Sequence, residues 1–334
     1  MGTTNEILKM LKISGGEALS GEEIAAQLSI SRNSVWKAIN KLKEIGYEIS
    51  ASTKTGYVLL SDGDVLTSDS VLEFVNPSYT SLKIEVIESI TSTNTALKLR
   101  AEDGEQAGTI LIAEEQTKGK GRVGRSFVSP KKCGLYMSMI LRPNIPVESA
   151  LLITTMAAVA VSKAIEEVSD KKAYIKWVND IYVDKKKVCG ILTESSIDFE
   201  SGMLNYAVLG MGVNIKEPEN GYSEELRDIV GSMYKENPPM GIRSKLAAAI
   251  INNFMKLYET LEDKSFMQEY QDRSLLTGIE IDFVQGTRNF HGRVLGIDKD
   301  ARIEVRLASG EKRSFSAGEI QINKQFLKQI KETK

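Results

Sequence analysis

Over its first sixty residues the chain spaces its apolar positions as helices do and then alternates them as strands do. This spacing predicts three helices and a two-stranded hairpin. The segments are Thr3–Lys12, Gly21–Leu28, a third helix that follows Ser31, and two short strands between Tyr47 and Leu60. Ser20 and Glu23 form a capping box before the second helix, and Gly46 suits the C-terminal end of the third. The order is that of a winged helix-turn-helix, which we place at residues 1–63 with the helix-turn-helix at 21–40.

Beyond this module, short apolar strands alternate with helices. Residues 64–81 form a polar connector with one predicted short helix, Ser70–Val75. The predicted strands that follow are Lys83–Ile90, Thr109–Glu114, Gly134–Leu141, Tyr174–Val183, Lys187–Ser195 and Tyr206–Val213. The predicted helices are one capped by Ser92-Thr93-Asn94 that runs to about Glu102, and Val147–Val168. Because Tyr206–Val213 is apolar on both faces, we expect it at the centre of the sheet. The pattern predicts an α/β domain with a mixed sheet at residues 82–272.

Short strands separated by turn residues continue to the C-terminal end. They are predicted at Ile279–Val284, Phe290–Ile297, Ala301–Leu307 and Lys312–Ile320. About five strands in so short a segment predict an SH3-like barrel at residues 275–325. We interpret His291 and Arg293 as strand-surface residues, and Lys324–Lys334 as a short basic tail helix.

The composition is that of an ordinary soluble globular protein. The 334 residues suffice for two or three domains, with 42% hydrophobic and 26% charged residues. The net charge of −2 means that any nucleic-acid surface must be local. The N-terminus lacks the pattern of a signal peptide, and the apolar run Ser149–Ser162 is too short to span a bilayer. We interpret that run as a buried core helix and expect a cytoplasmic protein that does not enter membranes.

Two cysteines and one histidine restrict the chemistry. Cys133 and Cys189 supply neither a disulfide framework nor a zinc ligand set, and we expect both to serve as small apolar residues in a reducing cytoplasm. His291 is the single histidine, which excludes schemes that need two. Its place in a strand-like segment near the C-terminus argues against a Ser/His/Asp triad.

Positive charge gathers around the third predicted helix. From residue 31 to residue 57 the chain carries five basic and two acidic residues, a local charge of +3. The start of this helix offers side chains to base edges and phosphates. The candidate DNA contacts are Ser31, Arg32, Asn33, Ser34, Lys37 and Lys54. Trp36 is assigned to packing. Winged helices also bind proteins, and a charge of +3 leaves that alternative open.

A glycine-rich basic loop joins two of the predicted strands. It reads Gly119-Lys120-Gly121-Arg122-Val123-Gly124-Arg125. Glycines allow close approach of the backbone to a ligand, and the cations suit carboxylates and phosphates. The spacing matches the dinucleotide fingerprint formally, but residues 126–130 do not open the helix that this fingerprint requires. The loop is therefore predicted to fold around an anion, with a flexible surface loop as the alternative.

Four motifs in order resemble those of the biotin protein ligases. They are Ser92-Thr93-Asn94, the glycine-rich loop, residues 175–182 with 185–194, and Gly210-Met211-Gly212-Val213-Asn214-Ile215. Together with the winged helix, they make the chain similar to the bifunctional ligases that also repress the biotin operon. The resemblance covers nearly the whole chain. It implies the catalytic fold shared with lipoate ligases and, distantly, with class II aminoacyl-tRNA synthetases.

The resemblance also implies site residues. Those expected to bind biotin are Ser92, Thr93, Asn94, Gln116, Lys120, Gly121, Arg122, Lys187 and Gly190. Those expected to bind nucleotide are Arg122, Arg125, Phe127, Asn179, Asp180 and Asn214. Arg122 and Lys187 are the expected catalytic residues, whereas Lys185 and Lys186 are assigned to a solvated turn. No metal ligand is assigned to side chains, and Mg²⁺ is expected on the phosphates of ATP.

The implied chemistry is two acyl transfers. Biotin and ATP give biotinyl-5′-AMP and pyrophosphate, and a lysine of a biotin carboxyl carrier domain of a carboxylase then takes the biotinyl group. The adenylate is also the expected corepressor: it would order the loop, which we expect to be disordered when empty, and favour a homodimer through the central sheet on operator DNA. Two alternatives remain, a ligase whose N-terminal module does not bind DNA, and a lipoate-type ligase or ligand-sensing repressor without catalysis.

The sequence departs from the usual family pattern at four positions. Lys120 stands where arginine is common, and Val123 replaces a basic residue. Val178 takes the place of a proline, and Phe127 that of a tryptophan. The principal charged groups persist, so we expect activity with a weaker hold on the adenylate.

Overall fold

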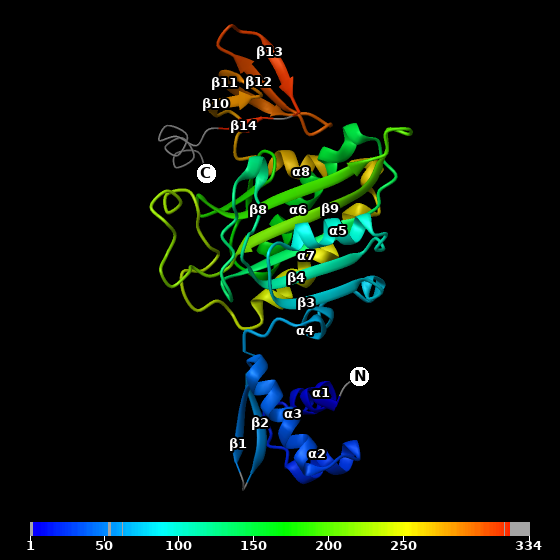
Figure 1. Cartoon of the computed structure of the whole chain (residues 1–334). Helices are drawn as coiled ribbons and strands as arrows, with labels where there is room; N and C mark the ends of the chain where they lie inside the picture. Colours follow the sequence, from blue (N-terminus) through cyan, green and yellow to red (C-terminus); the bar gives the residue numbers. More distant parts are fainter. Residues whose placement is uncertain (1–2, 53–54, 62, 317, 321–334) are drawn as a thin grey trace. The chain divides into compact units, whose positions relative to one another are not determined.

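The computed structural model describes residues 3–52, 55–61, 63–316 and 318–320 (Figure 1). The chain forms two compact units, residues 1–70 with 239–244, and residues 71–238 with 245–334. Lys54, the predicted tail Lys324–Lys334 and the last residues of the predicted barrel lie outside the described residues.

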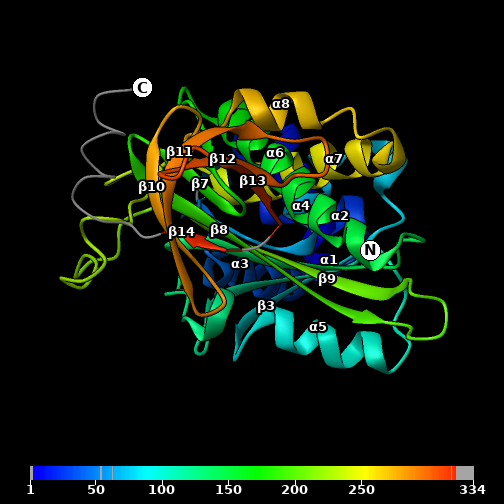
Figure 2. The same cartoon turned by 90° about the horizontal axis from the view of Figure 1, so that it is seen from above.

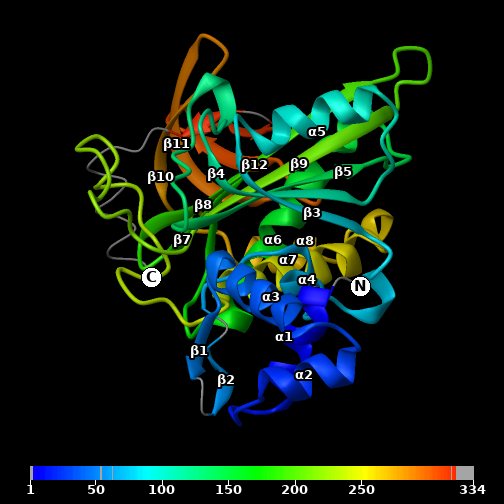
Figure 3. The ribbon, with the colours of Figure 1, turned by 60° about the horizontal axis from the view of Figure 1, so that its bottom comes forward.

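The first unit contains three helices and a hairpin, as predicted. They are α1 (Thr3–Ile13), α2 (Gly21–Leu28), α3 (Arg32–Ile45), β1 (Glu48–Ser52) and β2 (Gly56–Ser61). Figure 3 shows α3 beside α1 and α2, with the antiparallel hairpin following it. The capping box is present, because the Ser20 hydroxyl accepts from the Glu23 backbone N–H and the Glu23 carboxylate accepts from that of Ser20. Gly46 ends α3 in the left-handed conformation, with φ of 118°.

The core of this unit forms along one face of α3. The residues predicted on this face, Val35, Ile39 and Leu42, are all buried and pack with Ile7 and Leu11 of α1.

Trp36 lies away from that core. Its side chain is 55% exposed, so the prediction that it serves packing is wrong. The apolar stripe of α3 already fills the space beneath the helix, and the adjacent position faces outward.

The second unit is built on a seven-stranded mixed sheet. The strands are β3 (Lys83–Ile90), β4 (Thr109–Gln116), β5 (Gly134–Leu141), β6 (Tyr174–Lys176), β7 (Asp180–Val183), β8 (Lys186–Ile197) and β9 (Leu204–Asn214). Their order is β3-β4-β5-β9-β8-β7-β6, with β3 and β4 parallel and all other neighbours antiparallel. The central place of β9 confirms the prediction from its uniformly apolar sequence.

Helices cover both faces of this sheet (Figure 2). They are α5 (Thr93–Glu102) on one face and α6 (Ala150–Val168), α7 (Ile242–Tyr258) and α8 (Met267–Asp272) on the other, after a short helix α4 (Ser68–Leu72) in the connector. The segment Val147–Val168 is long and apolar enough to cross a membrane, but most of its apolar stretch is buried inside the protein, as expected of a core helix.

Helices α7 and α8 were not predicted from the sequence, because no element was predicted between residues 216 and 272. The signal for α7 was available. Leu246, Ile250 and Phe254 recur at intervals of four residues and are fully buried.

The predicted strand Tyr174–Val183 is wrong. It is two short antiparallel strands, β6 and β7, joined by a reversal at residues 177–179. Trp177 lies in this reversal and is buried. Its indole Nε1 donates to the carbonyl oxygen of Ala301 at 2.8 Å, so a contact with a distant part of the chain stabilises the reversal. Asn179 therefore lies in the turn, and Asp180 begins β7.

The C-terminal part forms a separate five-stranded antiparallel sheet. Its strands are β10 (Glu280–Gln285), β11 (Arg288–Ile297), β12 (Ile303–Leu307), β13 (Lys312–Phe315) and β14 (Glu319–Ile320), in the order β13-β12-β11-β10-β14. The rings of Phe283, Phe290 and Phe315 pack together in its interior. His291 is 49% exposed and pairs with Asp282 across β10 and β11, which fits its assignment to the strand surface.

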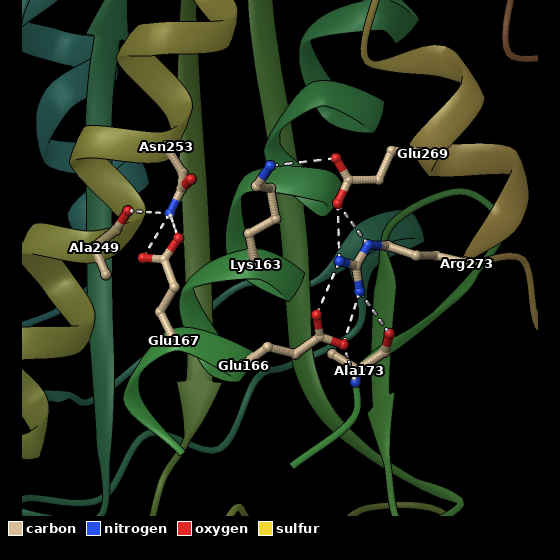
Figure 4. Close-up of polar contacts among 8 residues, drawn as sticks. All are labelled: Lys163, Glu166, Glu167, Ala173, Ala249, Asn253, Glu269 and Arg273. Atoms are coloured by element: carbon tan, nitrogen blue, oxygen red, sulfur yellow. Dashed lines mark hydrogen bonds and ion pairs between the residues drawn. The ribbon is translucent and has the colours of Figure 1, made fainter. Parts of the chain in front are cut away.

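One polar cluster ties α6 and α8 to the segment that precedes β6 (Figure 4). Arg273 binds both carboxylate oxygens of Glu166 at 2.9 Å and contacts Glu269 at 2.8 Å. It also donates to the carbonyl oxygen of Ala173 at 3.2 Å. Its side chain is 16% exposed, so these charge-assisted bonds are partly shielded from water.

Replacing Arg273 with methionine should lower the free energy of unfolding by about 2 kcal/mol, because Glu166 and Glu269 lose their shared cation inside the fold. Lys163→Met is the matched control. Lys163 reaches Glu269 only at 3.4 Å and is 36% exposed, so its loss should lower the free energy by less than about 0.5 kcal/mol. Urea titration of the two variants measures the difference, and equal values would contradict the anchoring role.

Candidate functional site

An open pocket lies over the middle of the seven-stranded sheet. Its empty space is about 310 Å³, including the part that opens to solvent. The lining residues are Ser92, Thr93, Asn94, Gln116, Lys120, Phe127, Met137, Ser138, Gly190, Leu192, Gly210, Met211 and Gly212. Seven of the predicted site residues are among them: Ser92, Thr93, Asn94, Gln116, Lys120, Phe127 and Gly190. A pocket of this size, lined by both apolar and fixed polar groups, suits a small organic ligand.

Asn94 is held by three hydrogen bonds, which leave one acceptor site on its amide oxygen for a ligand. Its amide nitrogen donates to the carbonyl oxygen of Leu192 at 3.2 Å and to the carboxylate of Glu194 at 3.1 Å. Its amide oxygen accepts from the Ser138 hydroxyl at 2.6 Å. Gly210 makes room for this arrangement, because a Cβ atom there would stand 2.0 Å from the Asn94 oxygen. The orientation of Asn94 is thus set before any ligand binds.

Gln116 is oriented in the same way from the other side. Its amide oxygen accepts from the backbone N–H of Thr93 at 2.9 Å. Because a backbone N–H can only donate, the side-chain nitrogen must point elsewhere. That nitrogen donates to the Ser129 hydroxyl at 3.0 Å. The amide nitrogen keeps one further N–H that a ligand in the pocket can use, since Gln116 belongs to the lining.

Phe127 lies against two glycines of the pocket. A Cβ atom at Gly212 would stand 2.6 Å from the Phe127 ring, and one at Gly190 would stand 3.3 Å from it. Phe127 was expected among the nucleotide-binding residues, but it lines the same pocket as Ser92, Thr93 and Asn94. The Phe127 ring can therefore pack against either of the two ligands that the sequence predicts, biotin or nucleotide.

The glycine-rich loop folds back on itself as a small hairpin. The Phe127 backbone N–H donates to the carbonyl oxygen of Gly119 at 2.9 Å, and that of Gly121 to Arg125 at 2.7 Å. The tip turns at Val123 and Gly124, where φ is 54° and 72°. No helix follows the loop, which excludes the dinucleotide fold here. Since the loop is folded in this structure, the expectation that a ligand orders it stays a prediction.

A cationic cluster lies beside the pocket. Arg122 donates to the Asn179 side-chain oxygen at 3.0 Å, and Lys187 pairs with Asp180 at 2.6 Å. Lys176 is buried 3.9 Å from the same carboxylate. Burial, together with the smaller effect of the nearby cations, lowers the pKa of Lys176 to about 8, although Asp180 acts in the opposite direction. This cluster brings together four residues that were predicted separately, and Lys176 was missed.

The cluster and the pocket meet at Gly190. The Cε atom of Lys187 lies 3.6 Å from where a Cβ atom of Gly190 would stand. An anionic group of a ligand in the pocket would therefore be within reach of Lys187. Asn214 is separate, because its amide donates to the carbonyl oxygen of Gly231. Arg125 lies at the exposed base of the hairpin tip.

The neighbours of Lys187 differ from each other. Lys185 lies in the turn before β8, with φ of 66°. Lys186 was assigned to a solvated turn, but its ammonium donates to the carbonyl oxygens of Arg227 and Asp228 at 2.8 and 2.7 Å. That part of the prediction is wrong, because the segment after β9 returns along the start of β8.

Several pocket residues were missed by the sequence analysis. They are Met137, Ser138, Leu192, Gly210, Met211 and Gly212. The two glycines of this set gave a signal, because glycine inside a strand marks a close approach by another group. Ser138 gave none: its role depends on hydrogen bonds from β5 to Thr93 and Asn94 at the start of α5.

The candidate DNA-binding face lies on α3. Ser31 caps the helix by accepting from the Ser34 backbone N–H, and Arg32 pairs with Glu22 at 2.8 Å. Asn33 and Lys37 are exposed on the outer face. Among the described residues of α3 there are four basic side chains and one acidic one, so this face is positively charged.

Comparison with known proteins matches three parts of the chain to families. Residues 86–214 match the biotin/lipoate A/B protein ligase family, residues 3–58 an HTH domain, and residues 277–322 the biotin protein ligase C-terminal domain. The chain is 32% identical to the bifunctional ligase/repressor BirA of Bacillus subtilis, over 93% of this chain and 96% of that protein. It is 25% identical to the BirA of Escherichia coli over 94% of this chain and 96% of that protein. A biotin protein ligase from Aquifex aeolicus, solved with biotin and ATP, has a TM-score of 0.59 and 27% identity, covering 72% of this chain and 97% of that one.

Proposed function

The chain belongs to the family of bifunctional biotin ligase/repressors, and from its site we propose how it carries out both activities. It is a biotin protein ligase with an N-terminal helix-turn-helix DNA-binding domain. The observation that carries the mechanism is the junction at Gly190, where a pocket with pre-oriented amides meets a cluster of cations. We place biotin in the pocket and the triphosphate of ATP along the cluster.

In the first step, the biotin carboxylate attacks the α-phosphorus of ATP. A bond forms between a carboxylate oxygen and phosphorus, the bond to the bridging oxygen breaks, and pyrophosphate leaves with its electron pair. Asn94, Gln116 and Ser92 hold the ureido ring, while Lys187 and Arg122 neutralise negative charge as the carboxylate approaches the phosphate. No protein nucleophile is required.

In the second step, a neutral lysine amine of the carrier domain attacks the acyl carbon of biotinyl-5′-AMP. The amide forms, AMP leaves, and the amine loses a proton. Mg²⁺, when bound, would neutralise phosphate charge. Asp180 is the carboxylate placed to approach such an ion, but it is already paired with Lys187, so the phosphates would supply most of the ligands.

Biotinylation of a carrier domain tests the enzymatic proposal. The purified chain is incubated with ATP, Mg²⁺, biotin and an apo-carrier domain, and the product is weighed by mass spectrometry. We expect one biotinyl group on one carrier lysine. A parallel reaction with lipoate instead of biotin should give no product, and transfer of lipoate alone would favour the lipoate-type alternative.

The second part of the proposal concerns regulation. We propose that biotinyl-5′-AMP, held under the hairpin of residues 119–127, favours a homodimer through the central sheet, and that the dimer binds an operator with its two α3 helices. The C-terminal sheet is proposed to close as an SH3-like barrel that helps dock the carrier domain, and the protein to act in the cytoplasm. A gel shift with an operator duplex, with and without biotin plus ATP, tests this. Equal operator binding with and without biotin plus ATP would refute the corepressor role.

Trp36 gives a specific prediction for the DNA complex. It is exposed on the outer face of α3, one turn from Asn33 and beside Lys37, where an apolar ring can contact a thymine methyl group. Trp36→Ala should weaken operator binding about tenfold or more, with ligase activity unchanged. Ile13→Ala, which removes an even more exposed apolar side chain from α1, is the control.

Deoxyuridine substitution in the operator identifies the contact. The operator is selected with the full-length protein from a randomised duplex library in the presence of biotin and ATP. Replacing one thymine at a time removes one methyl group. At the contacted position the replacement should weaken binding of the wild-type protein but not of Trp36→Ala. If the two losses add at every thymine, Trp36 does not read a methyl group.

A further inference from the structure

Ser129 occupies a junction between the pocket and the glycine-rich hairpin. It lies outside the pocket lining, and it is only 4% exposed. Its hydroxyl accepts from the Gln116 amide nitrogen at 3.0 Å and donates to the Phe127 carbonyl oxygen at 3.1 Å. Its own carbonyl oxygen accepts from the Gln116 backbone N–H at 3.1 Å. One side chain thus contacts two residues that line the pocket without facing the pocket itself.

The same hydroxyl lies at the base of the hairpin. The Phe127 N–H closes the hairpin on Gly119, and a Cβ atom at Gly119 would stand 2.7 Å from the Ser129 oxygen. It would also stand 2.3 Å from the Phe127 carbonyl oxygen. The hairpin therefore begins in direct contact with the group that orients Gln116.

Loss of the hydroxyl would release both partners together. The Gln116 nitrogen would lose the acceptor that fixes its direction, and the Phe127 carbonyl would lose a donor inside the fold. A ligand held by Gln116 would likewise hold Ser129 and, through it, the base of the hairpin. Because the pocket and the hairpin share this hydroxyl, a ligand that stabilises the closed hairpin must bind more tightly when the hairpin is closed.

We propose that Ser129 is a positioning residue that couples occupancy of the pocket to closure of the hairpin, and thereby sets how long the activated ligand is retained. This inference rests on the proposed function, since it assumes that the pocket holds biotin and that the hairpin covers the adenylate. Ser129 contacts no reacting atom, so it acts through Gln116 and Phe127.

Kinetics of Ser129→Ala test the coupling. We expect KM for biotin to rise about tenfold and the release of biotinyl-5′-AMP to quicken about tenfold, with kcat for adenylation changed less than about twofold. Ser162→Ala is the matched control: Ser162 is fully buried in α6 and its hydroxyl has no hydrogen-bond partner among the described residues. That variant should match the wild type in both quantities.

A double-mutant cycle separates positioning from general disruption. In a Gln116→Ala background, Ser129→Ala should raise KM for biotin less than about twofold, because the group it orients is gone. If the two substitutions multiply instead, Ser129 does not act through Gln116 and the inference is overturned.

Limited trypsin digestion shows directly whether the hairpin is protected by ligand. Lys120, Arg122 and Arg125 are cleavage sites within it. Biotin plus ATP should protect these sites in the wild type and in Ser162→Ala but much less in Ser129→Ala. Full protection of Ser129→Ala would overturn the inference while leaving the ligase assignment intact. Failure of the wild-type protein to biotinylate a carrier would instead refute the proposed function.

Discussion

Replacing Lys187 with alanine should slow adenylate formation by about two to three orders of magnitude, comparable to removing one preorganised charge donor from an active site. The ammonium of Lys187 is fixed by Asp180 at 2.6 Å and adjoins the pocket at Gly190. It is thus placed where the carboxylate of one substrate meets the phosphate of the other. Pyrophosphate release at saturating biotin and ATP measures the rate.

Lys185→Ala is the control for this loss of charge. Lys185 lies two residues away in the turn before β8 and carries the same charge. Its replacement should leave the rate within about threefold. A Lys187→Ala enzyme that released pyrophosphate as fast as the Lys185→Ala enzyme would remove Lys187 from the mechanism. Lys187→Arg should recover little, since a planar guanidinium does not reproduce a compact ammonium.

Replacing Gly210 with alanine should weaken biotin binding about a hundredfold. The new methyl group would stand 2.0 Å from the Asn94 side-chain oxygen and 2.8 Å from its Cγ atom. Asn94 is 4% exposed and held by Ser138 and Glu194, so it can yield only by breaking those bonds. Losing its orientation removes polar contacts that are each worth about 1–3 kcal/mol when buried. Isothermal titration with biotin measures the loss.

Two further variants show whether the effect is local. Gly296→Ala adds a methyl group to β11 where nothing lies within 4 Å, and should bind biotin as the wild type does. In the double variant Gly210→Ala with Asn94→Ala, the clash is gone, so thermal stability should recover towards that of Asn94→Ala alone. Biotin affinity should stay low. Recovery of both would mean that Asn94 does not hold the ligand.

The sequence predicted those elements whose limits depend on local chemistry. The ends of β3 and β5 agree with the prediction because turn residues and changes of polarity border both strands. The capping box of α2 and the glycine end of α3 also agree, since each is set by residues close in sequence.

The errors arise where distant contacts decide. The reversal between β6 and β7 depends on Trp177 reaching Ala301, more than a hundred residues away. No spacing within the segment contains that information. The motifs located the pocket correctly. The partners of its polar groups, such as Ser138 for Asn94, could not be predicted, because they too are brought together only by folding.

Lys176 gives the cationic cluster a group that can take up a proton. With a pKa of about 8, part of the population carries a neutral amine in mildly alkaline medium. A polyphosphate arriving beside it favours the ammonium form, so association takes up a proton from solution. The affinity for nucleotide would therefore fall as the pH rises above that pKa, even though the phosphates are fully ionised at such a pH.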